Sequence, residues 1–143
     1  MTIRKAIVGD AARLAELSGM LGYPVEPEAI RRRLERLSAK PDHVILVAEV
    51  SSNLVVGWIH AAEHDILEVG SFCEILGLVV AVDQRGEGIG RRLLEQAEHW
   101  ARARGLGEVS VRSNVTRAES HPFYERLGFV RMKTQHAYRK RIR

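Results

Sequence analysis

The hydrophobic and polar positions of this chain follow two different periods. Apolar residues that recur every three or four positions are typical of helices with one buried face, whereas alternating or short continuous apolar runs are typical of strands. The second kind of pattern predicts strands at Thr2–Val8, Val44–Val50, Leu54–Ala62, Cys73–Val82 and Glu108–Asn114, and one or two more between Phe129 and about Arg141.

The first kind of pattern predicts about four helices. They follow Asp10, cover Glu28–Ala39, run from Ile89 to a stop at Gly105, and span Phe123–Leu127 before a stop at Gly128. We expect the carboxylate of Asp10 to cap the first helix. Pro24 and Pro27 interrupt the chain between the first two helices. Polar residues predict a turn across Glu63–Gly70.

This order of elements predicts an α+β fold. We expect a mixed, mostly antiparallel central sheet of roughly six to seven strands, flanked by about four helices. Cys73–Val82 is the most apolar of the predicted strands, so we expect it at the centre of the sheet. The length of 143 residues predicts one domain over residues 1–143.

Composition narrows the class of protein. Apolar residues make up 45% of the chain and charged residues 28%, which is ordinary for a globular protein. No apolar run approaches the ~20 residues that span a bilayer, and Met1–Ala6 lacks an apolar signal core. The single cysteine, Cys73, excludes an intrachain disulfide. We therefore expect a cytoplasmic protein with no membrane partner.

The net charge of +4 raises the question of a nucleic-acid partner. Basic residues cluster at positions 31–36, within a helical pattern, and at positions 139–143. No aromatic residues accompany them in the way that RNA or single-strand binding requires. Positive charge alone is weak evidence, so we do not expect a nucleic-acid partner.

The segment Asp83–Leu94 carries the most specific chemical signal. Glycines at the alternate positions 86, 88 and 90 lie between an apolar run and a helical pattern. Such a loop exposes backbone N–H groups at a helix N-terminus, where the helix dipole adds partial positive charge. Glycine lets an anion approach the backbone because no Cβ stands in the way. The segment therefore predicts a phosphate-binding loop.

Several ligands of such a loop can be compared. A dinucleotide site requires G-x-G-x-x-G, but position 91 is arginine. A nucleoside-triphosphate loop requires lysine and Ser/Thr after the glycines, which Gly90-Arg91-Arg92 does not supply. A tight turn without a ligand stays open, although its three glycines are costly for a turn alone. The remaining interpretation is a loop for the diphosphate of coenzyme A.

Two motifs resemble those of the GCN5-related N-acetyltransferases. The cofactor motif of that family reads Gln/Arg-x-x-Gly-x-Gly/Ala, and Arg85, Gly88 and Gly90 stand in those places. It normally follows a strand that ends Leu-x-Val, and here Leu78–Val80 lies just upstream. The closing motif of the family, roughly Phe-Tyr-x-x-Leu-Gly-Phe, is matched by residues 123–129. The resemblance covers essentially the whole chain.

This resemblance implies an acyl-CoA N-acyltransferase-like α/β sandwich and an acetyl-CoA-dependent enzyme. Such an enzyme moves an acetyl group from the thioester to a primary amine by direct attack. The resemblance also implies that the backbone of Leu78–Val80 pairs with the pantetheine arm, that the N–H of Val80 donates to the thioester carbonyl, and that the diphosphate lies mainly on backbone N–H groups. The implied cofactor-binding residues are Leu78, Val79, Val80, Arg85, Gly86, Glu87, Gly88, Ile89, Gly90, Arg91, Asn114 and Tyr124.

Two catalytic residues are also implied, each with a simpler alternative. Glu74 stands where some members of the family carry a general-base glutamate. Alternatively, Glu74 is a solvated carboxylate at an edge or mouth position, and the base is a water relay, which the family often uses. Tyr124 matches the tyrosine that protonates the leaving thiolate in many relatives. A phenol with a pKa of ~10 is a usable acid toward a thiolate whose conjugate thiol has a pKa of ~8.5 or above. The alternative is an interior tyrosine whose hydroxyl bonds to the backbone.

The closing region departs from the family pattern at Arg117 and Ser120, where many relatives carry asparagine and alanine. The role of Arg117 stays open. Pro122 does not fit a helix interior, so we expect the last helix to begin near Ser120, with Pro122 in its first turn.

Metal and thiol chemistry are not expected. His60–His64 spells H-x-x-E-H, an inverted zinc-protease pattern. On a strand, the two histidines share a face but lie too far apart to bind one ion. Cys73 has no identifiable base and is expected to pack in the core.

The sequence does not specify the acceptor amine. The resemblance implies that Tyr23–Glu26 and Glu63–Glu68 line the acceptor mouth, and their carboxylates would attract a cationic amine. Small-molecule and peptide amines both fit: an aminoglycoside, a polyamine, an amino-acid-like amine or a protein. The alternative function is a non-catalytic acyl-CoA-binding or regulatory module of the same fold. A homodimer is suggested by the family alone.

Overall fold

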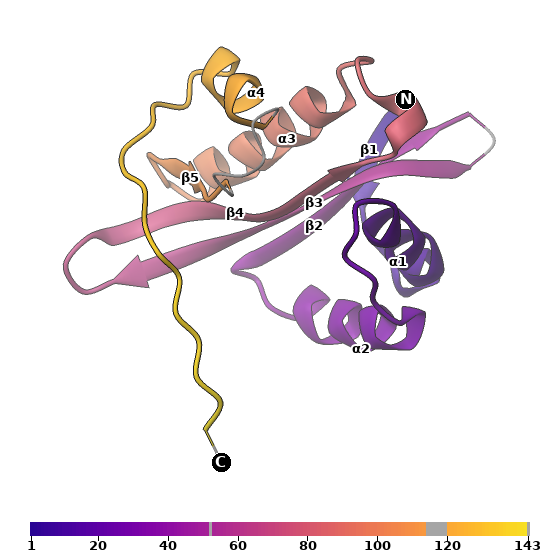
Figure 1. Cartoon of the computed structure of the whole chain (residues 1–143), viewed down its shortest axis with the longest axis horizontal. Helices are drawn as coiled ribbons and strands as arrows, with labels where there is room; N and C mark the ends of the chain where they lie inside the picture. The colour runs from indigo at the N-terminus through magenta and orange to yellow at the C-terminus, as the bar shows by residue number, and fades with distance from the viewer. Residues whose placement is uncertain (52, 114–119, 143) are drawn as a thin grey trace. The chain divides into compact units, whose positions relative to one another are not determined.

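The computed structural model describes residues 1–51, 53–113 and 120–142 (Figure 1). The chain divides into two compact units, Met1–Val111 and Arg112–Arg143. The single domain expected from the chain length stays a prediction. Within the described ranges, no helix has both the length and the apolar character needed to cross a membrane.

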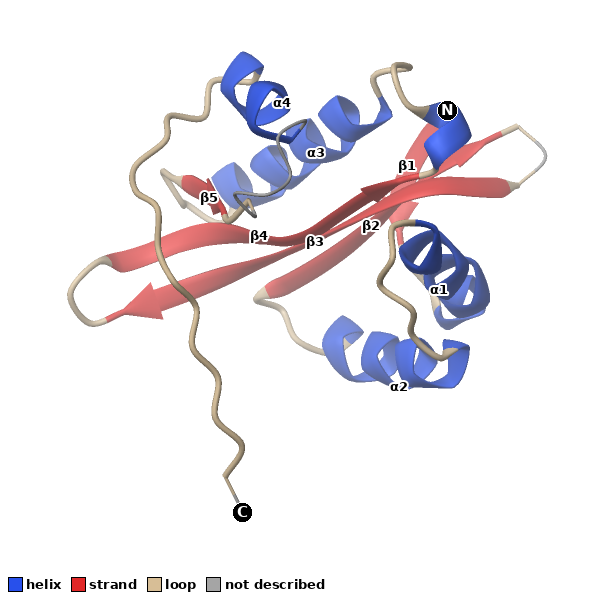
Figure 2. Ribbon diagram, viewed as in Figure 1, coloured by secondary structure: helices blue, strands red, loops and turns tan. Residues whose placement is uncertain are grey.

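The larger unit is built on one sheet (Figure 2). Its strands are β1 (Thr2–Lys5), β2 (His43–Val50), β3 (Leu54–Ile66), β4 (Gly70–Val80) and β5 (Val109–Val111). They lie in the order β1-β2-β3-β4-β5, with antiparallel pairing from β1 to β4 and parallel pairing between β4 and β5. The mixed, mostly antiparallel sheet is confirmed. The described residues form five strands, so the expectation of six to seven is wrong.

The final strands expected between Phe129 and Arg141 are not formed. In this segment Val130, Met132 and Tyr138 are 78%, 84% and 93% exposed. An alternating pattern specifies a strand only where one face of that strand is buried. The apolar positions of this segment lack such burial, which explains why the sequence pattern overestimated the sheet.

The central strand is β3 rather than β4. Together they form a long hairpin that extends through most of the turn expected at Glu63–Gly70, leaving only residues 67–69 as the turn. This end of the hairpin contains several polar residues, which is typical of a loop, but the backbone on both sides of the turn pairs. His64 lies opposite Phe72, and Asp65 lies opposite Ser71.

Three helices of the larger unit cover the two faces of the sheet: α1 (Ala11–Met20), α2 (Pro27–Ser38) and α3 (Ile89–Ala103). This unit also has the short 3-10 turns η1 (Val8–Asp10) and η2 (Val82–Gln84), and the smaller unit contains α4 (Ser120–Arg126). α3 lies over one face of the sheet, and α1 and α2 lie over the other (Figure 1). Leu17 of α1, Leu34 of α2 and Leu93 of α3 are buried between these layers. Each of these three helices therefore turns an apolar side toward the sheet.

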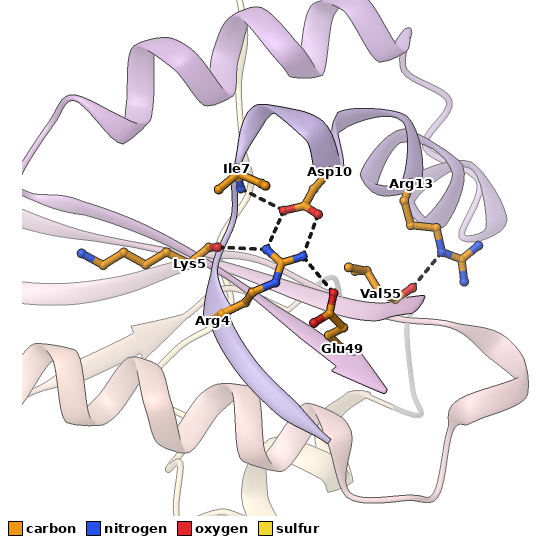
Figure 3. A network of polar contacts seen from close by, with 7 residues as sticks. All are labelled: Arg4, Lys5, Ile7, Asp10, Arg13, Glu49 and Val55. Carbon is orange, nitrogen blue, oxygen red and sulfur yellow. Dashed lines mark hydrogen bonds and ion pairs between the residues drawn. The ribbon is translucent and has the colours of Figure 1, made fainter. Parts of the chain in front are cut away.

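Hydrogen bonds of the Asp10 side chain connect the start of α1 to β1 (Figure 3). Its carboxylate accepts hydrogen bonds from the Arg4 guanidinium, both at 2.9 Å, and from the Ile7 N–H at 2.8 Å. Arg4 also donates to Glu49 of β2 at 3.2 Å. Asp10 does not cap α1 through its side chain, as had been expected. Burial alone would raise the pKa of Asp10, but the hydrogen bonds from Arg4 and Ile7 outweigh burial and hold that pKa below its ordinary value.

Replacing Asp10 by Asn tests this link. We expect the free energy of unfolding at pH 7 to fall by about 1–3 kcal/mol, because Arg4 loses a charged acceptor. Since the folded-state pKa of Asp10 is lowered, its contribution is complete above the unfolded value of 3.8 and is lost as pH falls through the folded pKa. Urea unfolding of both proteins at several pH values should show the difference narrowing in acid.

Glu16→Gln is the matched control, because Glu16 pairs with Arg13 on an exposed part of α1. We expect its effect to stay within about 0.5 kcal/mol. A destabilisation of Asp10→Asn that is as large in acid as at pH 7 would show that the Asp10 charge does not stabilise the fold.

Candidate functional site

The two edges of β4 are paired to different lengths. Toward β3, pairing covers the whole strand, with a register shift that leaves Leu76 as a β-bulge. Toward β5, pairing covers only Cys73 to Ile75 and stops directly before the bulge. Among the strands that the structure describes, residues 76–80 are therefore paired on one edge alone.

The unpaired edge of β4 carries two backbone donors. The N–H of Ala81 donates to the carbonyl of Val56, at the end of the ladder with β3, at 2.8 Å. Because N–H groups alternate between the two edges of a strand, those of Leu78 and Val80 point away from β3. They point to the edge where β5 no longer pairs. An extended chain lying along this edge would meet both donors.

The loop after β4 leads directly into α3. Gly86 and Gly88 have φ values of 86° and 76°, a left-handed conformation that glycine adopts without steric cost. Gly88 is the N-cap of α3, and its carbonyl accepts the hydrogen bond of the Arg92 N–H at 3.1 Å. No side chain caps the helix, and its first turn has no acidic residue. The N–H groups of residues 89–91 thus have no acceptor within the helix and lie at its positive end.

The charged side chains of this loop are exposed. Arg85, Glu87 and Arg91 all face solvent. Arg91 donates to Glu95, one turn further along α3, at 3.2 Å. Backbone N–H groups, rather than these side chains, therefore form the geometry that suits an anion.

A glycine in β3 sets the position of α3. A Cβ on Gly57 would lie 3.0 Å from the carbonyl oxygen of Val79, and 3.2 and 3.3 Å from the side chains of Leu93 and Ile89. The absence of that Cβ lets the first turn of α3 pack directly on the sheet, where Ile89 is 4% and Leu93 0% exposed. We did not single out Gly57 from the sequence, although a glycine inside a strand pattern signals close approach of another segment.

Glu74 lies on β4 and contacts a histidine of β3. Its Oε1 is 2.7 Å from Nε2 of His64, and the two side chains are 13% and 37% exposed. The His64 ring also packs near Phe72, with ring centroids 5.5 Å apart. Glu74 is therefore a shielded carboxylate that is partnered by an imidazole, rather than a solvated residue at the mouth of its strand.

The other residues of the H-x-x-E-H pattern make separate contacts. His60 Nε2 lies 2.9 Å from Nδ1 of His43, and Glu63 accepts a hydrogen bond from Arg104 at 2.8 Å. Burial, with a smaller contribution from His43, lowers the pKa of His60 to about 4. In the described part of the chain, no group of three or more His, Cys, Asp or Glu residues could hold a metal ion.

Cys73 lies in the core, as expected. Its side chain is fully buried at 0% exposure. Burial is the main cause that raises the pKa of its thiol to about 11, and the negative charge of Glu74 adds to it. The residue is thus a packed thiol near neutral pH rather than a nucleophile.

In the smaller unit, the motif at residues 123–129 specifies how α4 ends. The N–H of Phe129 donates to the carbonyl of Tyr124 at 3.1 Å, and that of Gly128 donates to Glu125 at 3.2 Å. With Gly128 at a φ of 92°, this is a Schellman motif. The hydrophobic contact of that motif joins the rings of Tyr124 and Phe129, whose centroids lie 5.7 Å apart. The motif therefore orients the tyrosine.

Other predictions for this region have different outcomes. α4 begins at Ser120, which places Pro122 in the first turn as predicted. Asn114 and Arg117 lie outside the described residues, so their roles stay predictions.

Trp58 of β3 and Gly77 of β4 form a close contact that sequence reasoning missed. A Cβ on Gly77 would lie 2.7 and 2.8 Å from atoms of the Trp58 ring. Gly77 directly follows the β-bulge, so the ring covers the part of β4 whose other edge is unpaired. The indole N–H is buried and has no hydrogen-bond partner among the described residues.

A cavity of about 180 Å³ lies elsewhere in the larger unit. Its lining includes Lys5, Ser38, His43 and Trp100. None of its lining residues belongs to the loop before α3 or to the Glu74–His64 contact, so it is not part of the candidate site.

Gly77→Ala should destabilise the protein by about 1–3 kcal/mol, because the Trp58 ring must move to admit the methyl group. Gly19→Ala is the matched control. Gly19 lies in α1, and a Cβ there would meet no atom within 4 Å. Alanine favours a helix, so the control should be neutral or stabilising by up to about 1 kcal/mol. Thermal unfolding followed by circular dichroism measures both, and equal effects would refute the close contact.

Both a family model and known proteins match this sequence. A model of the acetyltransferase (GNAT) family matches residues 12–129. An uncharacterized N-acetyltransferase of Bacillus subtilis is 31% identical over 116 residues, covering 76% of this chain and 82% of that protein. Glucosamine 6-phosphate N-acetyltransferase 1 of Oryza sativa is 33% identical over 135 residues, covering 85% of this chain and 80% of that protein.

Solved structures agree with these matches. The aminoglycoside antibiotic 6'-N-acetyltransferase of Acinetobacter haemolyticus superposes with a TM-score of 0.85 at 20% identity, covering 99% of both chains, and shows the fold. Glucosamine-6-phosphate N-acetyltransferase of Arabidopsis thaliana has a TM-score of 0.82 at 26% identity, covering 96% of this chain and 97% of that one. The resemblance found in the sequence is therefore confirmed. The chain belongs to the acetyltransferase (GNAT) family and is an acyltransferase.

Proposed function

We propose that this protein moves an acetyl group from acetyl-CoA to a primary amine by direct attack of the amine on the thioester. One observation carries the proposal: the unpaired edge of β4, with the N–H groups of Leu78 and Val80, continues through a short loop into the uncapped start of α3. Acetyltransferases of this family use acetyl-CoA as cosubstrate, which supports the choice of donor.

The chemistry of coenzyme A matches these two sets of donors. Its diphosphate is an anion, which suits the N–H groups around residues 86–90, and Arg85 and Arg91 add positive charge at the rim. Its pantetheine arm carries amides that are able to pair with a strand edge as an added strand. We assign the Val80 N–H to the thioester carbonyl, where negative charge develops during attack.

Proton transfers complete the reaction. An alkylammonium must lose a proton before its nitrogen attacks, and we assign that proton to Glu74. The nitrogen then forms a bond to the thioester carbon, the carbon–sulfur bond breaks, and the electron pair leaves with sulfur. We assign protonation of the thiolate to Tyr124, on the strength of the motif that orients its ring. The newly bonded nitrogen gives up its second proton to solvent, which leaves the neutral amide, and solvent returns a proton to the phenolate. Asn114 remains a proposed contact of the arm.

The acceptor is a small-molecule or peptide amine. Similar proteins are named for glucosamine 6-phosphate and for aminoglycosides, which supports a small-molecule amine as one of these two classes. The cytoplasmic location, the homodimer and the absence of a metal stay predictions.

Tyr124→Phe tests the general acid in an acetyl-CoA turnover assay over a panel of amines. We expect kcat to fall about 100-fold, because the phenol is lost while the ring is kept. The Kd for acetyl-CoA, measured by calorimetry, should stay unchanged. Tyr138→Phe is the matched control, since Tyr138 is 93% exposed, and its kcat should equal that of the wild type.

Equal turnover of Tyr124→Phe and the wild type would remove Tyr124 from the mechanism. A wild-type protein that binds acetyl-CoA but acetylates no amine would instead be the non-catalytic acyl-CoA-binding module.

The acceptor mouth is proposed to include Glu26 and Glu68. Glu26 is the N-cap residue of α2, but its side chain makes no capping hydrogen bond, and Glu68 lies in the exposed turn of the β3–β4 hairpin. Glu26→Gln and Glu68→Gln should each raise the KM for a cationic amine about three- to tenfold, because attraction of the cation is lost. Glu35→Gln, on the exposed surface of α2, is the control. Unchanged KM values in both variants would exclude this acceptor mouth.

A further inference from the structure

We propose that His64 is a positioning residue that takes the acceptor proton from Glu74 and delivers it to solvent. The inference rests on the proposed function, in which Glu74 removes a proton from the attacking ammonium. It adds a second group to that step and explains how the carboxylate is returned to its charged form after each turnover.

The fold brings the two side chains together. The β3–β4 register places Glu74 opposite Ala62, and His64 lies two residues further along β3. Side chains at such diagonal positions project from the same face of an antiparallel pair and are within reach of each other. The contact between Nε2 and Oε1 is 2.7 Å, the length of a charge-assisted hydrogen bond.

The difference in exposure between the two side chains indicates the direction in which the proton moves. The side chain of Glu74 is 13% exposed, whereas that of His64 is 37% exposed. His64 therefore connects a shielded carboxylate to water. The nearest histidine on the same face of β3, His60, is engaged with His43 through its Nε2 at 2.9 Å, so it forms a separate pair. Glu63, beside His64 in sequence, bonds to Arg104.

The chemistry requires such an exit for the proton. When the ammonium gives its proton to Glu74, the carboxylate becomes a neutral acid and is unable to act again until it loses that proton. In the resting pair the Nε2–H of His64 donates to the carboxylate. Once Glu74 is protonated, exchange with solvent moves the imidazole proton to Nδ1, and the acid then gives its own proton to Nε2 and forms an imidazolium. The imidazolium releases its Nδ1 proton to water, and the remaining Nε2–H again donates to the charged carboxylate. One proton thus passes from the amine to solvent, and both side chains return to their initial states. Imidazole suits this role because it exchanges protons near neutral pH.

Two substitutions at His64 separate proton transfer from simple support. Glutamine places an amide N–H close to the position of Nε2, so His64→Gln keeps a hydrogen bond to Glu74 but is unable to relay a proton. His64→Ala removes both functions and leaves space for added imidazole. His99→Gln, on the exposed surface of α3, is the matched control.

The test is steady-state turnover of acetyl-CoA with an amine that the wild type acetylates. We expect kcat to fall at least about tenfold in both His64→Gln and His64→Ala, with the KM for acetyl-CoA unchanged. Added imidazole should restore kcat of His64→Ala in proportion to its concentration and should not affect His99→Gln. Circular dichroism and thermal unfolding of each variant verify that the fold is intact.

Three outcomes would overturn the inference. If His64→Gln keeps the wild-type kcat, His64 only supports Glu74. If imidazole fails to restore His64→Ala, no proton passes through this position. If the wild type acetylates no amine, the proposed function itself fails and the relay falls with it, whereas normal turnover in the His64 variants would refute the relay alone.

Discussion

The close packing of α3 on β3 at Gly57 is the constraint on which the candidate site depends. A Cβ at that position would lie only 3.0 Å from the Val79 carbonyl oxygen and 3.2–3.3 Å from the side chains of Leu93 and Ile89 in α3, so these groups would have to move apart. Because Gly57 has no Cβ, the start of α3 lies against the sheet near the end of β4. The positive end of the helix and the edge of the strand are therefore held together by core packing, which is the stiffest part of a protein.

The second constraint is the different pairing of the two edges of β4. Pairing with β5 ends at Ile75, the β-bulge follows at Leu76, and the N–H groups of Leu78 and Val80 face an edge that no described strand covers. A ligand that bonds to this edge and to the start of α3 is recognised through the backbone. Recognition of this kind places little demand on side chains, which agrees with a shared fold at 20% identity and a TM-score of 0.85.

The sequence was informative where structure is specified locally. The alternating glycines predicted the loop and the start of α3, and the closing motif predicted a helix stop at Gly128, which the structure shows as a left-handed C-terminal glycine. Features that depend on tertiary packing were missed. The length of the β3–β4 hairpin was not predicted, because polar residues suggested a turn. Backbone pairing between two strands does not depend on polar or apolar side chains, so composition does not reveal it. The Glu74–His64 contact depends on strand register. The close packing at Gly57 depends on α3, which is distant from Gly57 in the sequence.

The most direct test of this account is to follow the backbone amide resonances of the protein by NMR during titration with coenzyme A and with its two parts. Coenzyme A should shift the amides of residues 86–91 together with those of Leu78 and Val80. ADP alone should shift only the first group, and pantetheine alone should shift only the second. Shifts by coenzyme A that leave both groups unchanged and fall elsewhere on the chain would contradict the account.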